Sequence, residues 1–371
     1  MSINSSTNNL PINSIPFVGP VETQPDTTEF TPEENRQLYT MLGGHSLFAC
    51  FRAASKFDLF SILSSRGKMT CGEIAKSLGI AIQPARIMLL PLVMGGALKK
   101  EGHYYSNTRL AESLLVRGAP DAINECIEWQ QQIVYPAIQH LYEALQTNQN
   151  VGLKEFEGNE PTLYQRLVHD PKRERVFQNA MQEISVQANR HFAENVDFSE
   201  IQHLVDVGGG NGTNAMALAS RWPHLRVTVF DSASVCEIAE ANIAKAGMSD
   251  RVGTFVGNCF ESEFPLDADC LLFSHFFTIW SPEKNQFLLK KSFDSLPSGG
   301  KVMLFNMMQH DDETGPWSAA IGSPYFLALA TGEGMLYTWQ EYESWMQSVG
   351  FTQTERHELP KDHGVILGIK A

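Results

Sequence analysis

Residues 204–212 read Leu-Val-Asp-Val-Gly-Gly-Gly-Asn-Gly, and this stretch decides the fold. An apolar strand that carries one acid, Asp206, runs directly into a glycine-rich turn, and residues 213–221 continue with a helix-like pattern. Glycine has no Cβ, so a ligand can come into contact with the backbone of the turn. The free N–H groups at the start of the helix face the same point. On its own the pattern also fits an ordinary tight turn between a strand and a helix.

Further strand-like segments follow this turn and alternate with helical stretches. They are residues 226–230, 252–256, 269–273 and 301–305, with a last one at 364–369 that we expect at the edge of the sheet. The alternation predicts a mostly parallel sheet flanked by helices, an α/β fold of the Rossmann-like class. Ligands bind such sheets at the carboxyl ends of the strands. The residues that we expect at or beside those ends are Asp206, Gly208, Gly210, Asp231, Asn258, Cys259, Phe260, Ser274 and His275.

The spacing of the glycines favours S-adenosylmethionine (SAM) over a dinucleotide as the bound cofactor. The nicotinamide fingerprint is G-x-G-x-x-G, whereas Gly208, Gly210 and Gly212 stand at alternate positions, so the third glycine of the fingerprint is missing. SAM has no phosphate that needs a close backbone bed. It needs clearance for its amino-acid end, an acid for the ribose and a flat apolar seat for adenine, and Asp231 and Phe260 meet the last two needs.

Several separated segments resemble the dimeric class I SAM-dependent small-molecule methyltransferases, which are the plant-type or acetylserotonin-type O-methyltransferases. The resemblance spans roughly residues 38–371. The segments that carry it are 46–63 (a first long helix), 69–78 and 84–95 (a winged-helix segment), 99–106 (its wing), 170–171 with 177–181 (a helix that faces the substrate), 280–284 (after the fourth strand) and Gly299-Gly300 (before the fifth).

We expect four parts along the chain. Residues 1–30 are rich in Ser, Asn, Pro and Thr and lack the basic start and apolar stretch of a signal peptide, so they read as a flexible arm. Residues 31–115 read as an all-helical, winged-helix-like domain, which the resemblance assigns to dimerisation. Residues 116–194 are connecting helices, including 123–145 and 171–193, that roof the cleft. Residues 195–371 form the SAM-binding catalytic domain.

The resemblance also implies how the cofactor is held. Gly208 and Gly210 line its methionine end, Asp231 holds the ribose and Phe260 packs on the adenine ring. Asn258 stands where the family has an acid near the adenine amine, and its carbonyl oxygen can still accept a hydrogen bond. The expected cofactor residues also include Asp206, Ser274 and Cys259, the last as a small apolar filler.

The family's chemistry depends on a general base that this chain lacks. In the family a His in a His-Asp-Trp motif after the fourth strand removes the acceptor proton, and here Thr278 and Ile279 stand in place of the His and Asp. Asn306 and Leu336 stand where plant members carry two flanking acids. A positioned base contributes about 10²–10⁴-fold to a rate. A threonine hydroxyl does not titrate near neutral pH, so Thr278 marks the catalytic position without supplying a base.

Three explanations of the missing base are open at this point. The acceptor is a carbon, a nitrogen or an already ionised oxygen that needs little help, and proximity supplies most of the rate. Alternatively, another group is the base. Alternatively, the bound sulfonium serves a non-methylating step such as a cyclisation or a pericyclic reaction. The candidate replacement bases are His275, which also suits a polar gap beside the strand end, and His310, which also suits a surface loop.

The acceptor cleft is expected to be apolar and aromatic, which suits a flat or greasy acceptor. The resemblance places Met181, Phe277 and Trp317 against the substrate. Trp280 and Asn179 are further candidates, Asn179 to orient a polar substituent. For any single aromatic residue, a position in the ordinary core is the simpler alternative.

The composition excludes several classes of protein. The chain has 371 residues, of which 43% are hydrophobic and 19% charged, as in a globular protein of two domains. A net charge of −14 without a basic stripe argues against nucleic acid and anionic membranes as partners. None of the six cysteines has zinc spacing, so no metal site is predicted, and free thiols fit a reducing cytoplasm. No apolar run reaches the ~18 residues of a membrane-spanning helix.

The sequence therefore predicts a cytoplasmic, homodimeric methyltransferase that uses SAM, releases S-adenosylhomocysteine and acts on carbon, nitrogen or oxygen of a small apolar or aromatic secondary metabolite. The alternatives are a SAM-binding enzyme of the same fold with a non-methylating reaction and a non-catalytic binding homologue. The retained glycines, Asp231 and Phe260 argue against loss of the cofactor.

Overall fold

The computed structural model describes residues 30–371 and divides into two units, one that ends at Ala49 and one that spans Cys50–Ala371. The predicted arm, residues 1–30, lies outside the described residues except for Phe30. The first unit holds the start of helix α1 (Pro32–Lys56), which begins at the predicted cap, because the Glu34 N–H donates to Thr31 Oγ1 at 3.2 Å. Its exposed apolar side chains are Leu38, Tyr39, Met41 and Leu42.

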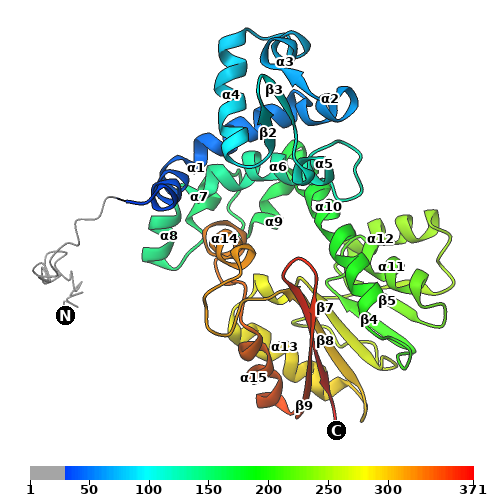
Figure 1. The fold of residues 1–371 in the computed structure, drawn as a ribbon. Helices are drawn as coiled ribbons and strands as arrows, with labels where there is room; N and C mark the ends of the chain where they lie inside the picture. The colour runs from blue at the N-terminus through cyan, green and yellow to red at the C-terminus, as the bar shows by residue number, and fades with distance from the viewer. Residues whose placement is uncertain (1–29) are drawn as a thin grey trace, which may run out of the picture. The chain divides into compact units, whose positions relative to one another are not determined.

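The N-terminal part of the second unit is mainly helical and contains one small sheet (Figure 1). Its helices are α2 (Leu59–Arg66), α3 (Cys71–Leu78), α4 (Ile82–Met94) and α5 (Arg109–Leu114). Its antiparallel strands, in the order β1-β3-β2, are β1 (Met69–Thr70), β2 (Leu98–Glu101) and β3 (Tyr104–Asn107). The hairpin of β2 and β3 occupies the predicted wing. No single helix among residues 30–371 is long and apolar enough to cross a membrane, and α3 with α4 meets that criterion only as a pair bent by 111°.

The connecting segment differs from the prediction in one helix and agrees in another. The continuous helix expected at 123–145 is wrong, because the structure has α6 (Asn124–Trp129), the π-helical turn η1 (Gln130–Val134), α7 (Tyr135–Ile138) and α8 (Leu141–Thr147). Pro136 has no N–H to donate to the preceding turn, which explains the interruption. After η2 (Val151–Glu155), α9 (Leu163–Arg166) and η3 (Leu167–His169), helix α10 (Pro171–Asn195) forms as predicted, and Asp170 Oδ1 accepts from the N–H groups of Lys172 and Arg173 at 3.1 and 3.0 Å.

The C-terminal part of the second unit contains a seven-stranded sheet in the order β6-β5-β4-β7-β8-β10-β9. Its strands are β4 (His203–Val207), β5 (Arg226–Asp231), β6 (Val252–Val256), β7 (Cys270–Ser274), β8 (Lys301–Met307), β9 (Gln353–Leu359) and β10 (His363–Ile369). The first five strands of that order are parallel, and β10 runs antiparallel to both of its neighbours. The expected edge position of the last strand is wrong, because β9 pairs outside it. β9 is rich in charged residues, which suits an exposed edge, whereas Val365 and Ile366 of β10 are fully buried.

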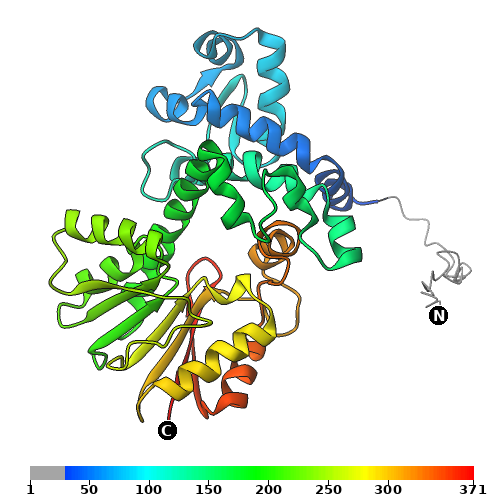
Figure 2. The same cartoon turned by 180° about the vertical axis from the view of Figure 1, so that it is seen from behind.

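Helices cover both faces of the sheet, as the two opposite views show (Figure 1, Figure 2). α10, α11 (Thr213–Arg221) and α12 (Ala233–Lys245) pack on one face, where Phe192 stacks on Phe305 with ring centroids 4.4 Å apart. α13 (Pro282–Ser295) and α15 (Trp339–Val349) pack on the other. The remaining helical segments are η4 (Phe277–Ile279), α14 (Trp317–Tyr325) and η5 (Phe326–Ala330). The strand order reverses between β4 and β7, so a ligand site is expected at the carboxyl ends of these strands.

Candidate cofactor and acceptor site

The glycine turn after β4 is tied to the end of β5. Gly208 and Gly210 have φ values of 72° and 59°, in the left-handed region. A Cβ at position 208 would lie 2.4 Å from Cδ2 of Phe276, so a side chain cannot be accommodated there without a shift of that ring. The Gly208 N–H donates to the Phe230 carbonyl at 2.8 Å, and the Gly210 N–H donates to Asp231 Oδ2 at 3.1 Å. Asp231 therefore shapes the turn as well as standing where the ribose is expected.

Buried acceptor oxygens without partners gather beside this turn. Asp206 is fully buried, its Oδ2 accepts from Asn214 Nδ2 at 3.4 Å, and burial raises its pKa to about 7. Asp206 Oδ1, Asn214 Oδ1 and Asn189 Oδ1 are buried without a hydrogen-bond partner in the described chain. Buried polar groups are normally hydrogen-bonded, so three orphaned acceptors in one place indicate that a donor-rich ligand binds there.

These residues line a cavity of about 170 Å³ between α10 and the strand ends. α10 contributes residues at helical spacing, and the strand ends contribute the glycine turn with Ser274 and His275. The α10 residues of this lining are Gln178, Met181, Gln182, Ser185 and Asn189. The orphaned oxygens suit the ammonium group of a methionine end, and the glycines give its carboxylate access to backbone N–H groups. The residues present therefore fit SAM.

The residues expected to hold adenine are mainly aromatic, and Asn258 is the polar member of the group. Phe260 packs edge-on against Trp280 with centroids 5.1 Å apart, and the Lys284 ammonium lies 4.6 Å above the Trp280 ring. The Asn258 carbonyl oxygen already accepts from the Phe260 N–H at 3.1 Å, so one of its two lone pairs is committed to the turn. Burial raises the pKa of the Cys259 thiol to about 12, so this side chain stays an uncharged filler.

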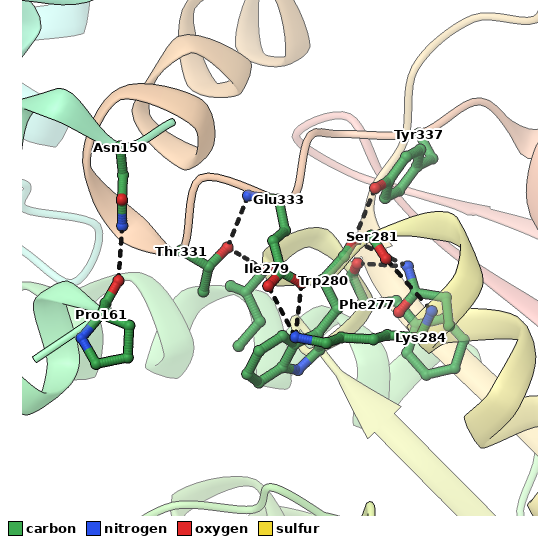
Figure 3. A network of polar contacts seen from close by, with 11 residues as sticks. Asn150, Pro161, Phe277, Ile279, Trp280, Ser281, Lys284, Thr331, Glu333 and Tyr337 are labelled. Atoms are coloured by element: carbon green, nitrogen blue, oxygen red, sulfur yellow. Dashed lines mark hydrogen bonds and ion pairs between the residues drawn. The ribbon is translucent and has the colours of Figure 1, made fainter. Parts of the chain in front are cut away.

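The turn that carries Thr278, the predicted catalytic position, is held rigidly. Thr278 is buried, and its hydroxyl donates to the His275 carbonyl at 3.4 Å. The backbone around it is clamped by the segment 331–338, which we call the clamp segment (Figure 3). In this clamp the Thr331 hydroxyl donates to the Ile279 carbonyl, and the Tyr337 hydroxyl donates to the Trp280 carbonyl at 2.7 Å.

The clamp is closed by an ion pair and by close packing. Lys284 pairs with Glu333 at 2.8 Å (Figure 3), and a Cβ on Gly334 would lie 2.1 Å from the Thr278 carbonyl oxygen. Asn306 and Leu336, which the resemblance aligns with two acids of plant members, are buried and uncharged. Both polar atoms of the Asn306 amide are without a partner in the described chain. None of the three positions therefore supplies a titratable group.

His275 is the one titratable imidazole that the structure places in the lining of the described cofactor cavity. Its φ of 52° is unusual for a residue with a side chain, and its N–H donates to the Phe305 carbonyl at 2.7 Å. Its Nε2 lies 3.1 Å from Nε2 of His363, and its Nδ1 lies 3.3 Å from the Ser274 hydroxyl. Burial lowers the His275 pKa to about 3, so the ring is neutral at physiological pH.

Three of the predicted catalytic and substrate residues that lie away from this cavity are Phe277, His310 and Trp317. Phe277 is fully buried against Phe273 at a centroid distance of 4.7 Å, because its turn presents it to the core under α13 and α15, so its expected substrate contact is wrong. His310 lies in an exposed turn, where its N–H donates to the Gly315 carbonyl at 2.8 Å, and it does not reach the cavity. Trp317 is 81% exposed at the start of α14.

Asn179 faces a second, larger cavity of about 490 Å³, where its amide donates to Glu125 at 3.2 Å. It stands on the other side of α10 from Met181 and Ser185, because helix periodicity separates the two faces. Gln182 borders both cavities. About half of the residues in each lining carry an amide or a carboxylate group. The predicted apolar and aromatic acceptor cleft stays a prediction. The α10 spacing of 178, 181, 182, 185 and 189 would have revealed Gln182 and Asn189 in the sequence, whereas Asn214 needed the fold.

The sequence matches two family models that fit this architecture. An O-methyltransferase dimerisation domain matches residues 39–117, and an O-methyltransferase domain matches residues 138–352. The chain belongs to the O-methyltransferase family and is a SAM-dependent methyltransferase, which confirms the predicted fold, enzyme class and cofactor.

Individual relatives differ in the atom that they methylate. The chain is 36% identical to an L-tyrosine C(3)-methyltransferase of Streptomyces lavendulae, over 91% of this chain and 94% of that one. It is 31% identical to a 3-hydroxy-5-methyl-1-naphthoate 3-O-methyltransferase of Streptomyces sahachiroi, over 86% and 90%. Among solved structures it is similar to the SAM-dependent methyltransferase SibL, with a TM-score of 0.83 and 34% identity over 90% of this chain and 98% of that one.

Proposed function

We propose that this protein transfers the methyl group of SAM to a ring carbon of a small aromatic secondary metabolite that carries polar substituents. The observation that carries this proposal is the loss of every titratable group at the family's base position and its two flanking positions, Thr278, Asn306 and Leu336, beside an intact cofactor turn. An electron-rich ring carbon attacks the methyl group with its own π electrons, so it does not need a hydroxyl to be deprotonated by a base at position 278. The 36% identity to a C-methyltransferase supports a carbon acceptor.

SAM supplies an electrophilic methyl group on a sulfonium, and this chain's residues orient it. We infer that Asp206, Asn189 and Asn214 accept hydrogen bonds from its ammonium group, since their oxygens are the orphaned acceptors of the cavity. Asp231 accepts from the ribose hydroxyls, and Phe260 packs on the adenine ring.

The test uses methyl-labelled SAM and a panel of phenolic amino acids, hydroxynaphthoates and aromatic amines. We expect release of S-adenosylhomocysteine and a carbon-bound methyl signal in the NMR spectrum of the product. An oxygen-bound methyl would contradict the carbon acceptor. Product formed without consumption of SAM would favour the non-methylating alternative, and Asp231→Ala, which removes the ribose acceptor and unpins Gly210, serves as the low-affinity control.

We also propose that the protein is a homodimer that pairs through its dimerisation domain. Helix α4 exposes four apolar side chains, Ile82, Ile87, Leu90 and Met94, and soluble chains seldom leave such a face in contact with water. The match of residues 39–117 to a dimerisation domain supports the same conclusion.

A further inference from the structure

Two histidines from distant parts of the sequence meet at the edge of the cofactor cavity. His275 follows β7, and His363 is the first residue of β10. Their Nε2 atoms are 3.1 Å apart, and both rings lie against Phe305, with centroids 4.8 and 5.6 Å from it. The contact is unusual because two imidazoles that face each other can form a hydrogen bond only if one ring donates and the other accepts.

The surroundings of His363 settle which ring donates. His363 Nδ1 lies 2.8 Å from the Lys361 carbonyl oxygen, which can only accept, so Nδ1 carries the proton. Lys361 and Asp362 have φ values of 62° and 59°, and this tight turn between β9 and β10 brings the carbonyl to the ring. Burial lowers the His363 pKa, so the ring is neutral and its Nε2 is an acceptor. His275 therefore donates from Nε2, and its Nδ1 keeps a lone pair.

We propose that His363 is a positioning residue that holds His275 in this tautomer, so that Nδ1 of His275 takes the proton released by the methylated ring carbon. This inference rests on the proposed function. The Ser274 hydroxyl, 3.3 Å from Nδ1, lines the same cavity and marks the side from which the proton arrives. The left-handed backbone at position 275 keeps the ring in place, a strain of the kind that gathers at functional sites.

The charges of the step balance. The ring carbon forms a bond to the methyl carbon, the electrons of the sulfur–carbon bond stay on sulfur, and the sulfonium loses its positive charge. The ring carbon now carries both a methyl group and a hydrogen, and loss of that proton restores the aromatic ring. The proton goes to Nδ1 of His275, whose imidazolium keeps its Nε2–H on His363. The step thus leaves the net charge of the cavity unchanged, because the positive charge lost by the sulfonium ends on the imidazolium. A His275 ring protonated while the sulfonium was intact would place a second positive charge beside it.

Because methyl transfer comes before proton removal, an imidazole of low basicity suffices. Burial makes His275 a poor base for a neutral hydroxyl. The proton on a positively charged, methylated ring is far more acidic, so a weak base removes it. A base at the family's position acts before transfer on a hydroxyl, whereas His275 acts after transfer on carbon.

The test measures tautomer and turnover on the full-length protein. The imidazole nitrogens are ¹⁵N-labelled, and long-range proton–nitrogen correlation spectra identify the protonated nitrogen of His275, assigned with His275→Asn. We expect Nε2 protonated and Nδ1 bare in the free wild-type protein. In His363→Leu, which removes the acceptor, we expect a mixture of tautomers and at least a tenfold lower kcat, with KM and the SAM Kd changed less than twofold. His363→Gln, which keeps an acceptor oxygen, should retain kcat within threefold.

Three outcomes would overturn the proposal: a proton on Nδ1 of wild-type His275, a His363→Leu variant with kcat within twofold of wild type, or a Gln variant as slow as the Leu variant. If His363→Leu does not fold, the wild-type spectrum and the Gln variant decide. The tautomer is read without any acceptor. Absence of methylated product from every acceptor would therefore count against the proposed function alone.

Discussion

Asp206 sits at the end of β4 with its carboxyl group enclosed, and its ionisation is linked to whatever binds beside it. Its pKa in the folded protein, about 7, lies above the ordinary 3.8 because burial disfavours the charged form. In the free protein the folded state therefore holds this proton more tightly than the unfolded state. The stability that Asp206 contributes is present at low pH and is lost as the pH rises from about 4 through about 7. A cation bound beside Asp206 stabilises the ionised carboxylate and so offsets this loss of stability at higher pH.

SAM should bind more tightly as the pH rises, because only the ionised Asp206 attracts its positive groups. With a pKa of about 7, the affinity should rise by up to about tenfold from pH ~6 to pH ~8. In Asp206→Asn the affinity for SAM should be lower and should no longer rise with pH. Because wild type and variant are compared at the same pH, the titration of SAM itself affects both equally. Isothermal calorimetry measures both proteins, with the exposed Asp250→Asn as control. An equal rise in Asp206→Asn would exclude this carboxyl group.

The His275→Asn variant tests whether the imidazole of His275 contributes to turnover. Asn tolerates the φ of 52° better than most residues that have a side chain, and it has no basic nitrogen. We expect kcat to fall at least ~10-fold, toward the lower bound of what a positioned base contributes, while the SAM Kd stays within twofold. Steady-state kinetics with an acceptor found in the panel of aromatic compounds, together with thermal unfolding, measures this. A kcat within twofold of wild type would remove His275 from the mechanism.

At the scale of single elements, β8 and α13 contain two buried asparagines in opposite situations. Asn306 of β8 has no hydrogen-bond partner for either amide atom in the described chain, whereas Asn285 of α13 lacks a partner only for its oxygen and donates from its nitrogen to the Phe277 carbonyl at 2.9 Å. The first amide loses hydration without compensation, and the second secures the turn that carries Thr278. Asn306 thus lowers the stability of β8, and Asn285 fixes the turn whose Trp280 carbonyl the clamp segment also binds.

Asn306→Leu should stabilise the protein, because leucine has a similar shape and no polar atoms to desolvate. We expect the free energy of unfolding to rise by about 1–2 kcal/mol. Asn285→Leu is the matched control and should lower it, since the Phe277 carbonyl loses its donor. Urea denaturation measures both. A less stable Asn306→Leu protein would mean that the amide is hydrogen-bonded in solution.

At the scale of the whole molecule, the exposed apolar face of α4 stands apart from the catalytic machinery. Leu90 is 66% exposed within the chain, although it belongs to a helix whose opposite residues, such as Leu89 and Leu92, are buried. A helix with apolar residues on both sides normally packs between two layers. A second copy of this chain supplies the second layer in our proposal.

Leu90→Glu should therefore convert the dimer into a monomer, because a carboxylate in an apolar interface remains without a partner. Light scattering after gel filtration at micromolar concentration measures the mass. Leu266→Glu, at a residue 86% exposed in the loop before β7, should leave the dimer intact. Equal masses for wild type and Leu90→Glu would place the interface elsewhere, or show that there is none.

Prediction from sequence succeeded where local patterns carry the information. The strands at 226–230 and 252–256 and the helix from Pro171 follow from β-branched runs and a capped, periodic pattern. It failed where position depends on neighbours distant in sequence. The last strand looked like an edge because it ends the chain, but β9 pairs outside it, and Phe277 looked like a pocket residue although its turn faces the core.

The sequence by itself determined the family, the parallel sheet, the glycine turn with its acid at position 231, and the threonine at position 278, where we propose that the family's base is replaced. These depend on residue type and on spacing within one segment. Only the tertiary structure decided that Asp206, Asn189 and Asn214 share one cavity, and that His275 meets His363 across 88 positions of the chain. Those contacts arise from strand order and helix packing, which bring distant segments together and leave no trace in local spacing.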